Sequence, residues 1–185
     1  NLLVTAGQVH GPVLRQVSCP GHVPGCDALL TTTPGLALAV ATADCMALLY
    51  RAPGVVAAAH AGWRGAAAGM PVATLEAVCT AAGRTADEVR VSLGPCIRSC
   101  CYEVGPEVAG AFPAAAVRRR GDHSFLDLPA VARSQLREAG LPASAFEDTG
   151  VCTACQPDLC FSYRRDGPET GRLWGVAALR VRRTV

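Results

Sequence analysis

The sequence predicts one domain of the α+β class, in which mixed β-sheets are flanked by helices. Many short apolar runs are bounded by glycine, proline or polar turn residues, a pattern typical of buried strands. Two longer stretches gather their apolar residues on one helical face. The chain has 185 residues, of which 50% are hydrophobic and 17% charged. It can therefore bury one substantial core and is not a disordered chain.

The first part of the chain predicts a succession of strands. Residues 2–9 and 13–17 are expected to form strands joined by a turn at 10–12, and a loop rich in glycine and proline follows over 19–27. Short apolar runs bounded by turns then predict four buried strands, at residues 28–32, 36–42, 45–50 and 55–59.

The second part of the chain predicts helices as well as strands. A helix is expected over 65–83, where Pro71 either kinks it or marks a late start. An amphipathic helix is expected over 128–140, ending at a glycine. The other expected elements are a strand at 89–93, a loop at 94–105, a short helix at 106–112, a polar excursion at 118–124, an irregular polar stretch at 152–172 and a closing strand at 173–181.

Composition argues against several classes of partner. The net charge is only +2, and all 17 basic residues are arginine, so a nucleic-acid partner is not expected. No uninterrupted apolar run is long enough to span a bilayer, so no membrane partner is expected. There are ten cysteines, several of them inside apolar runs, where free cysteine behaves as a small hydrophobe. With no signal peptide visible, these features favour the reducing cytoplasm.

His10, Cys45 and His60 form the first candidate site. Each lies at an end of an apolar strand, where binding groups collect at a cleft. Two imidazoles and a thiolate suit Zn²⁺ with the fourth tetrahedral position open, and the thiolate would also accept copper. Other interpretations stay open: Cys45 as a nucleophile with His60 as its base, or residues that only pack in the core.

Arginines supply candidate anion contacts. Arg64 follows His60 closely and would stabilise anionic charge near it. Arg164 and Arg165 form either a solvated turn or a clamp for phosphate or carboxylate.

Further cysteines give a second candidate cluster. Cys152 and Cys155 have the C-x2-C spacing of structural zinc or a redox pair. A complete zinc site needs a second pair of cysteines, and Cys100 and Cys101 are the only pair that the sequence offers for it. The alternative is plain loop cysteines, with Cys160 nearby.

Five motifs indicate a family. They are "QVHG", "TADC", "HAGWRG", "GPCIRSCCYEVG" and "SYRRDGPETGR". Together they resemble the laccase-domain or polyphenol oxidase family, which includes the purine nucleoside phosphorylase-like proteins YfiH and YlmD. The resemblance runs from about Gln8 to the closing strand. It implies a YfiH-like fold and places the family's zinc triad on His10, Cys45 and His60. Family members carry a further segment before "QVHG", with a "TR-GGVS" stretch, which we expect residues 1–185 to lack.

The resemblance also implies an activity. It implies a zinc-dependent enzyme that cleaves adenosine, inosine, guanosine and methylthioadenosine with phosphate and also deaminates adenosine. Cys45, His60 and Asp44 are then expected to be catalytic, with Asp44 behind the ligands or in proton transfer. The expected contacts to phosphate or substrate come from Arg64, Arg164 and Arg165.

Three alternatives stay open. One is a copper-dependent polyphenol oxidase, which a chain with only four histidines disfavours. Another is a hydrolase with Cys45 as nucleophile and His60 as base. A non-catalytic metal or redox scaffold is supported by the cysteine count alone. The sequence does not predict an oligomeric state.

Overall fold

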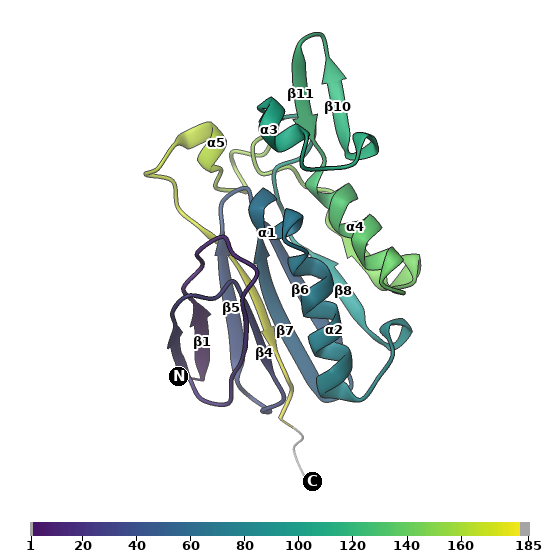
Figure 1. The fold of residues 1–185 in the computed structure, drawn as a ribbon. Helices are drawn as coiled ribbons and strands as arrows, with labels where there is room; N and C mark the ends of the chain where they lie inside the picture. The colour runs from purple at the N-terminus through teal and green to yellow at the C-terminus, as the bar shows by residue number, and fades with distance from the viewer. Residues whose placement is uncertain (1, 182–185) are drawn as a thin grey trace.

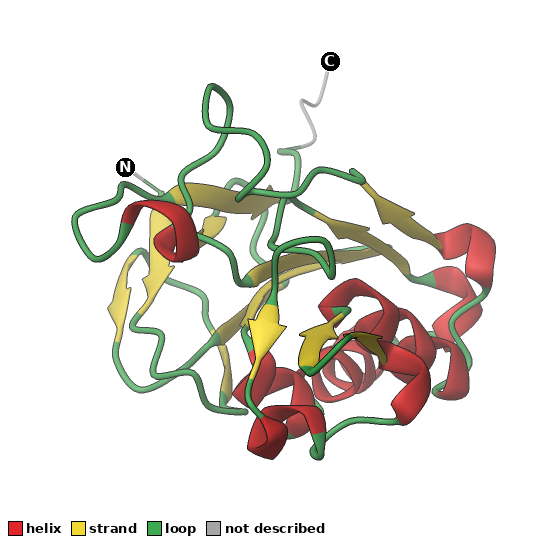
Figure 2. Cartoon of the chain, turned by 90° about the horizontal axis from the view of Figure 1, so that it is seen from above, coloured by secondary structure: helices red, strands yellow, loops and turns green. Residues whose placement is uncertain are grey.

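The computed structural model describes residues 2–181, which form three layers (Figures 1 and 2). A four-stranded sheet packs on one face of a six-stranded sheet, and the helices α2 (Met70–Ala82) and α4 (Leu128–Glu138) cover the other face. The predicted single α+β domain of mixed sheets flanked by helices is therefore confirmed. Asn1 and residues 182–185 of the predicted domain lie outside the described residues.

The six-stranded sheet is the central layer. Its strands, in order across the sheet, are β12 (Phe146–Asp148), β8 (Arg90–Leu93), β6 (Met46–Ala52), β7 (Val55–Ala61), β4 (Ala28–Thr31) and β2 (Leu14–Gln16). The strands β6 and β7 form an antiparallel hairpin in which Ala47 pairs with His60. This register brings the residue before β6 close to the end of β7, where the candidate ligands lie.

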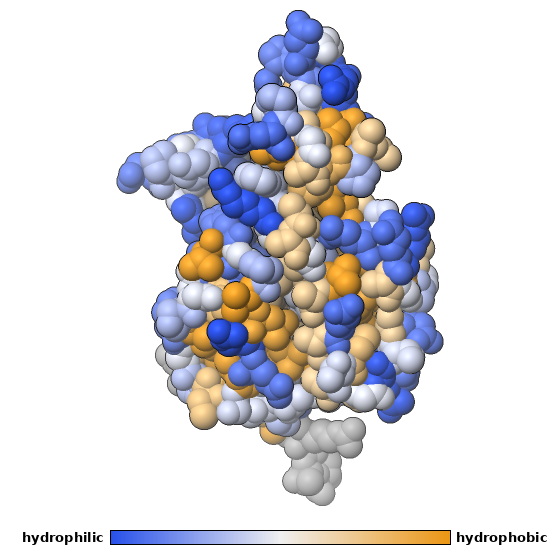
Figure 3. Space-filling model, viewed as in Figure 1, coloured by the Kyte–Doolittle hydropathy of each residue, from blue (hydrophilic) through white to orange (hydrophobic). Residues whose placement is uncertain are grey.

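Two smaller sheets flank the central one. The four-stranded sheet has the order β13 (Leu173–Ala178), β5 (Ala37–Thr42), β1 (Leu3–Ala6) and β3 (Gly21–Val23). A three-stranded sheet, with the order β10 (Val117–Arg120), β11 (His123–Leu126) and β9 (Glu103–Val104), projects beyond the layers. Hydrophilic residues dominate the outer end of this projection, whereas apolar residues gather over the lower half of the molecule in the same view (Figure 3).

Strand β7 is rich in alanine because both of its faces are covered. All seven of its residues are buried, because sheet and helices cover its two faces. Ala57, Ala59 and Ala61 face the core beneath the helices, and Val56 and Ala58 face the core between the sheets. Side chains alternate between faces along a strand. Small side chains on both faces therefore allow both neighbouring layers to approach the backbone of β7 closely.

The start of the chain differs from the prediction. The two predicted strands do not pair with each other: β1 belongs to the four-stranded sheet and β2 to the six-stranded sheet. The predicted loop over 19–27 contains strand β3, which pairs with β1. The connection between β1 and β2 turns sharply because Gln8 and His10 adopt positive φ values of 48° and 62°.

The predicted helix over 65–83 is two helices. α1 (Trp63–Ala67) and α2 are separated at Gly69, whose φ of 79° is left-handed. Pro71 lies in the first turn of α2, where a missing backbone N–H costs nothing. Pro71 thus marks a late start, which is one of the two predicted outcomes.

The remaining elements are short. The polar excursion forms the hairpin β10–β11, and the irregular polar stretch contains one helical turn, α5 (Tyr163–Asp166). Strand β12 was not predicted. The other short elements are α3 (Pro106–Ala109) and the 3₁₀ turns at Ala86–Glu88, Ala114–Ala116 and Ala143–Ala145. Within the described part of the chain, no helix has both the length and the apolar character needed to cross a bilayer.

An ion pair ties the loop after β8 to the end of β12. The Arg98 guanidinium donates to both carboxylate oxygens of Asp148 and also to the carbonyl of Val151. Burial alone would raise the pKa of Asp148, but Arg98 and the Gly150 N–H hold it below its usual value. The ionised carboxylate therefore stabilises the folded state.

We expect Asp148→Asn to lower the free energy of unfolding at neutral pH by about 1–3 kcal/mol, as measured by chemical denaturation. The folded-state pKa of Asp148 is below its unfolded value. Its contribution is therefore present above the unfolded value of about 3.9 and is lost as pH falls through the folded value. The gap between the two proteins should narrow in acid. A gap that stayed constant would contradict this account.

A matched control is Glu88→Gln, which removes the exposed ion pair with Arg84 on the surface. Exposed pairs at this spacing contribute about 0.3–0.5 kcal/mol. This variant should therefore unfold almost as the natural sequence does.

Candidate active site

The structure brings the three predicted ligands together. The ligand atoms of His10, Cys45 and His60 all lie within 4.8 Å of one another. The two imidazole rings have centroids 4.8 Å apart and are nearly perpendicular, at 86°. His10 comes from the turn after β1, Cys45 directly precedes β6, and His60 lies near the end of β7. Two nitrogens and one sulfur at this separation fit a tetrahedral zinc ion with one position left open.

Asp27 holds two of these ligands in place. Its fully buried carboxylate accepts a hydrogen bond of 2.8 Å from the Nδ1 of His60, which leaves Nε2 of that ring for a metal. The same carboxylate accepts three backbone N–H groups, those of Val9, His10 and Gly11, at 2.8–3.0 Å. A carboxylate behind a ligating histidine fixes its tautomer and orientation. Here it also fixes the backbone that carries the second histidine.

The electrostatics of the site favour an ionised thiol. Burial alone would raise the pKa of Cys45, but hydrogen bonds and charge from His10 and His60 lower it to about 7. Burial alone would lower the pKa of His60, but Asp27 and Cys45 raise it to about 9. The thiolate form of Cys45 is the form that binds metals. A neutral imidazole binds a metal as well, so a metal ion at this site competes with a proton on His60.

Gly62 leaves room for the cysteine. A Cβ at this position would lie 2.9 Å from Cys45 Sγ and 3.5 Å from Cδ2 of His10. The backbone of Gly62 has an ordinary φ of −79°. The glycine of the "HAGWRG" motif is therefore required by the space that Cys45 occupies, and not by backbone conformation.

A cavity of about 720 Å³ opens beside the three ligands. It is lined by residues of the β1–β2 turn, the β5–β6 turn, the start of α1, the loop after β8, helix α5 and the segment before β13. Its aromatic lining consists of Trp63, Tyr102 and Tyr163. The cavity is therefore assembled from segments that are far apart in the sequence.

Asp44 links the β5–β6 turn to the segment that carries helix α5. It lines the cavity, but both oxygens already accept hydrogen bonds, from the Thr153 hydroxyl at 2.6 Å and from the backbone N–H of Arg164 at 2.7 Å. Its φ of 94° is unusual for a residue with a side chain. In this geometry the carboxylate attaches helix α5 to the β5–β6 turn.

The predicted arginines separate into two groups. Arg64 and Arg164 line the cavity, whereas Arg165 does not. The Arg165 guanidinium donates to the backbone carbonyls of residues 153, 154 and 160 and to the Asp166 carboxylate. Arg165 therefore fixes the loop over 153–160 against helix α5. The Arg164 guanidinium binds the carbonyl of Glu103 at 2.9 Å. That of Arg64 lies 4.5 Å from the Trp63 ring centroid and has no hydrogen-bond partner among the described residues.

Sequence reasoning missed several residues of the site. Asp27 gave no signal, since it ends a loop of glycine and proline. Gln8 bonds both the N–H and the carbonyl of Ala41 through its side-chain amide. Tyr102 and Arg172 also line the cavity. Both lie within the motifs "GPCIRSCCYEVG" and "SYRRDGPETGR", so the motifs themselves contained that signal.

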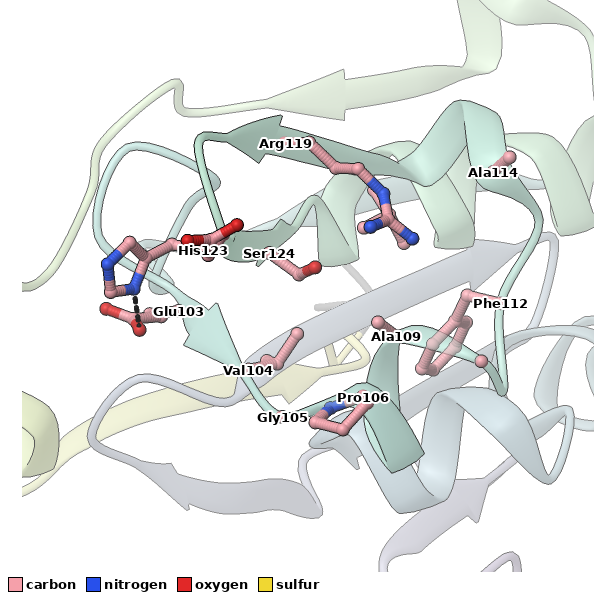
Figure 4. A pocket seen from close by; sticks show the side chains of 13 residues that line it. Glu103, Val104, Gly105, Pro106, Ala109, Phe112, Ala114, Arg119, His123 and Ser124 are labelled. Carbon is pink, nitrogen blue, oxygen red and sulfur yellow. Dashed lines mark hydrogen bonds and ion pairs between the residues drawn. The ribbon is translucent and has the colours of Figure 1, made fainter.

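A second cavity lies elsewhere. It measures about 760 Å³ and is formed by β9, α3 and the hairpin β10–β11 (Figure 4). Figure 4 shows His123 turned toward Glu103, and its Nδ1 lies 2.6 Å from that carboxylate. None of the predicted site residues lines this cavity, so it lacks the candidate ligands.

Comparison with known proteins identifies the family of the chain. Residues 1–180 match the family described as "Multi-copper polyphenol oxidoreductase laccase". The chain belongs to this family. The predicted family membership is therefore confirmed.

Relatives in the family are named as enzymes. A Deinococcus radiodurans protein named "Purine nucleoside phosphorylase" is 40% identical over 179 residues, which cover 93% of this chain and 68% of that protein. "Adenosine deaminase RL5", from an unknown prokaryotic organism, is 37% identical, with coverage of 80% and 60%. The prediction that the chain is an enzyme is thereby confirmed.

A solved structure tests the fold predicted for this chain. The crystal structure of YlmD from Geobacillus stearothermophilus superposes with a TM-score of 0.92 at 34% identity, covering 97% of this chain and 74% of that one. The predicted YfiH-like fold is therefore correct.

We expect Gly62→Ala to weaken the binding of a metal ion by His10, Cys45 and His60, because the new methyl group meets Cys45 Sγ at 2.9 Å. Loss of a group that supports a ligand typically lowers metal affinity 10–100-fold. Displacement of the ligand itself should lower the affinity at least as much. Competition with a coloured chelator measures this. Gly65→Ala is the matched control in the same motif, since its Cβ would meet nothing closer than 3.6 Å. Equal affinities of the two variants would contradict the steric argument.

Proposed function

We propose that this chain is a zinc-dependent purine nucleoside phosphorylase that also deaminates adenosine. Its proposed substrates are adenosine, inosine, guanosine and methylthioadenosine, with phosphate as the second substrate of phosphorolysis. The observation that carries the proposal is the placement of His10, Cys45 and His60 beside a cavity that also contains Arg64. The names of the relatives support the same pair of reactions.

Aromatic side chains suit the base of a nucleoside. Trp63, Tyr102 and Tyr163 all line the cavity, and aromatic rings pack favourably against flat ring systems. A cavity of about 720 Å³ lies within the usual range for small-molecule sites, about 300–1,000 Å³. The cavity therefore has the size and the lining that a purine nucleoside requires.

Arg64 suits the phosphate. Its guanidinium has no protein hydrogen-bond partner among the residues described, so its donors are free to bind an anion. Arg164 and Arg172 line the same cavity and donate to backbone carbonyls, which leaves them fewer donors for an anion. In this proposal Arg64 binds the phosphate, while Arg164 holds the wall of the cavity.

The triad supplies the metal chemistry. A zinc ion held by His10, Cys45 and His60 would act as a Lewis acid and lower the pKa of water bound to it. Asp27 keeps His60 in the ligating orientation. Asp44 holds α5 and Arg164 in place, and is here a positioning residue, because both of its oxygens accept hydrogen bonds from the protein.

We expect zinc-loaded protein to form adenine and ribose phosphate from adenosine only when phosphate is present, and inosine with or without it. Chromatography of the products measures both. His60→Ala should lose both products together with the metal ion of the triad. His123→Ala should retain both, because this exposed histidine lines the other cavity.

Two other outcomes would overturn the proposal. Oxidation of phenols that requires copper would favour the polyphenol oxidase. Turnover that survives complete metal removal but is lost in Cys45→Ser would favour Cys45 as a nucleophile, for which its lowered pKa is suited.

Arg64→Gln should raise the KM for phosphate about 10–100-fold, since a hydrogen bond to a charged group contributes about 1.5–3 kcal/mol. Its KM for adenosine in deamination should change little. The matched control is Arg119→Gln, because Arg119 lines the second cavity. A raised KM for phosphate in Arg119→Gln but not in Arg64→Gln would indicate that phosphate binds in the second cavity, and would contradict the role proposed for Arg64.

A further inference from the structure

A second group of metal-ligating side chains lies apart from the triad. It consists of Cys100 and Cys101, from the loop between β8 and β9, and Cys152 and Cys155, from the segment between β12 and α5. We call it the four-cysteine cluster. All four sulfur atoms lie within 4.8 Å of one another, and every member is a free thiol. The two pairs are about 50 residues apart in the sequence, so only the fold brings them together.

The spacing of the sulfurs fits a tetrahedral metal ion. Zinc binds thiolates at about 2.3 Å, which places the four sulfurs of a regular tetrahedron about 3.8 Å apart. Cys155 Sγ lies 3.6 Å from Cys100 Sγ and 3.3 Å from Cys101 Sγ. One sulfur thus has two close thiol neighbours from the opposite segment. A disulfide from Cys155 would join it to only one of these two neighbours and leave the other as a free thiol.

The backbone around the cluster is already in place. Cys96 and Cys152 form a parallel β-bridge, and the N–H of Thr153 donates to the carbonyl of Cys96. Arg98 donates to the carbonyl of Val151 across the same junction. The two cysteine-bearing segments are therefore held side by side by contacts that do not involve sulfur.

Two arginines contact the backbone of the cluster. Four thiolates around a divalent zinc ion form a complex with a net negative charge, which nearby cations stabilise. Arg120 donates to the carbonyls of Ser99 and Cys100, and Arg164 donates to that of Cys101. Neither arginine forms an ion pair with a carboxylate among the described residues. Their charge is therefore available to the cluster.

We propose that the four-cysteine cluster binds a second zinc ion, with a structural role, in addition to the one at the triad. Binding converts four thiols to thiolates and releases their protons, so it needs no oxidant or reductant. Four protein ligands leave no open position, which is the character of a structural zinc site. This inference concerns metal content and does not rest on the activity proposed above.

The cluster lies directly behind one wall of the cavity. Tyr102 follows Cys101 in the chain, and Thr153, between the two ligands of the other segment, donates to Asp44. Arg164 donates to the carbonyl of Cys101. A zinc ion that joins the two segments would therefore hold Tyr102, Asp44 and Arg164 in a fixed arrangement.

The test is the zinc content of the untagged chain, purified under reducing conditions and measured by elemental analysis. We expect two zinc ions per chain in the natural sequence and one in Cys100→Ser. Cys100 is exposed, so the variant should fold. Cys100→His should restore the second zinc, because imidazole is also a zinc ligand. Cys19→Ser, at an exposed thiol outside both groups, should keep two.

His60→Ala isolates the proposed site, because it removes a ligand of the triad only. This variant should retain one zinc, and removing that zinc with a chelator should lower its melting temperature. With cobalt in place of zinc, it should give the intense sulfur-to-metal absorption of a tetrathiolate site.

Three results would overturn the proposal. One is an equal zinc content in the natural sequence and Cys100→Ser. Another is a disulfide within the cluster in freshly purified protein, detected as a loss of two hydrogens by mass spectrometry. The third is iron and acid-labile sulfide at the cluster in place of zinc.

Discussion

The buried carboxylate of Asp27 is the interaction on which the candidate active site depends. It accepts three backbone N–H groups from the turn that carries His10 and a fourth hydrogen bond from His60. A buried charge is tolerated only when it is well hydrogen-bonded, so this turn and this histidine must stay where they are while Asp27 is ionised. One side chain thereby links the backbone of one ligand to the ring of another.

The layered fold explains why that linkage is rigid. Asp27 directly precedes β4, and the first residue of β4 pairs with Ala59 of β7, next to His60. The backbone N–H of His60 also donates to the carbonyl of Asp27. Because β7 is buried on both faces, the strand that carries the ligand cannot shift without disturbing two cores. Ligand geometry is thus inherited from the packing of the central sheet.

Much of this could be predicted from the sequence, but not all. The apolar runs located the strands from β4 to β8, and the motifs contained the three residues that the structure brings together, because both signals are local. The pairing of β1 with β3 and the role of Asp27 were not predictable, since each depends on a partner that no local pattern reveals. The two cysteine pairs were recognised, but their meeting depends on the bridge between Cys96 and Cys152.

The two hydrogen bonds of Asp44 have a consequence for the order in which the site is assembled. The triad and Asp27 all lie within the first 60 residues, whereas the partners of Asp44 are Thr153 and Arg164. A ribosome therefore delivers every ligand of the triad about 90 residues before the first of these partners. The candidate ligands are therefore synthesised first, but the cavity beside them is complete only after the segments that carry Thr153 and Arg164 have joined the fold, so closure of the cavity is a late step in assembling the site.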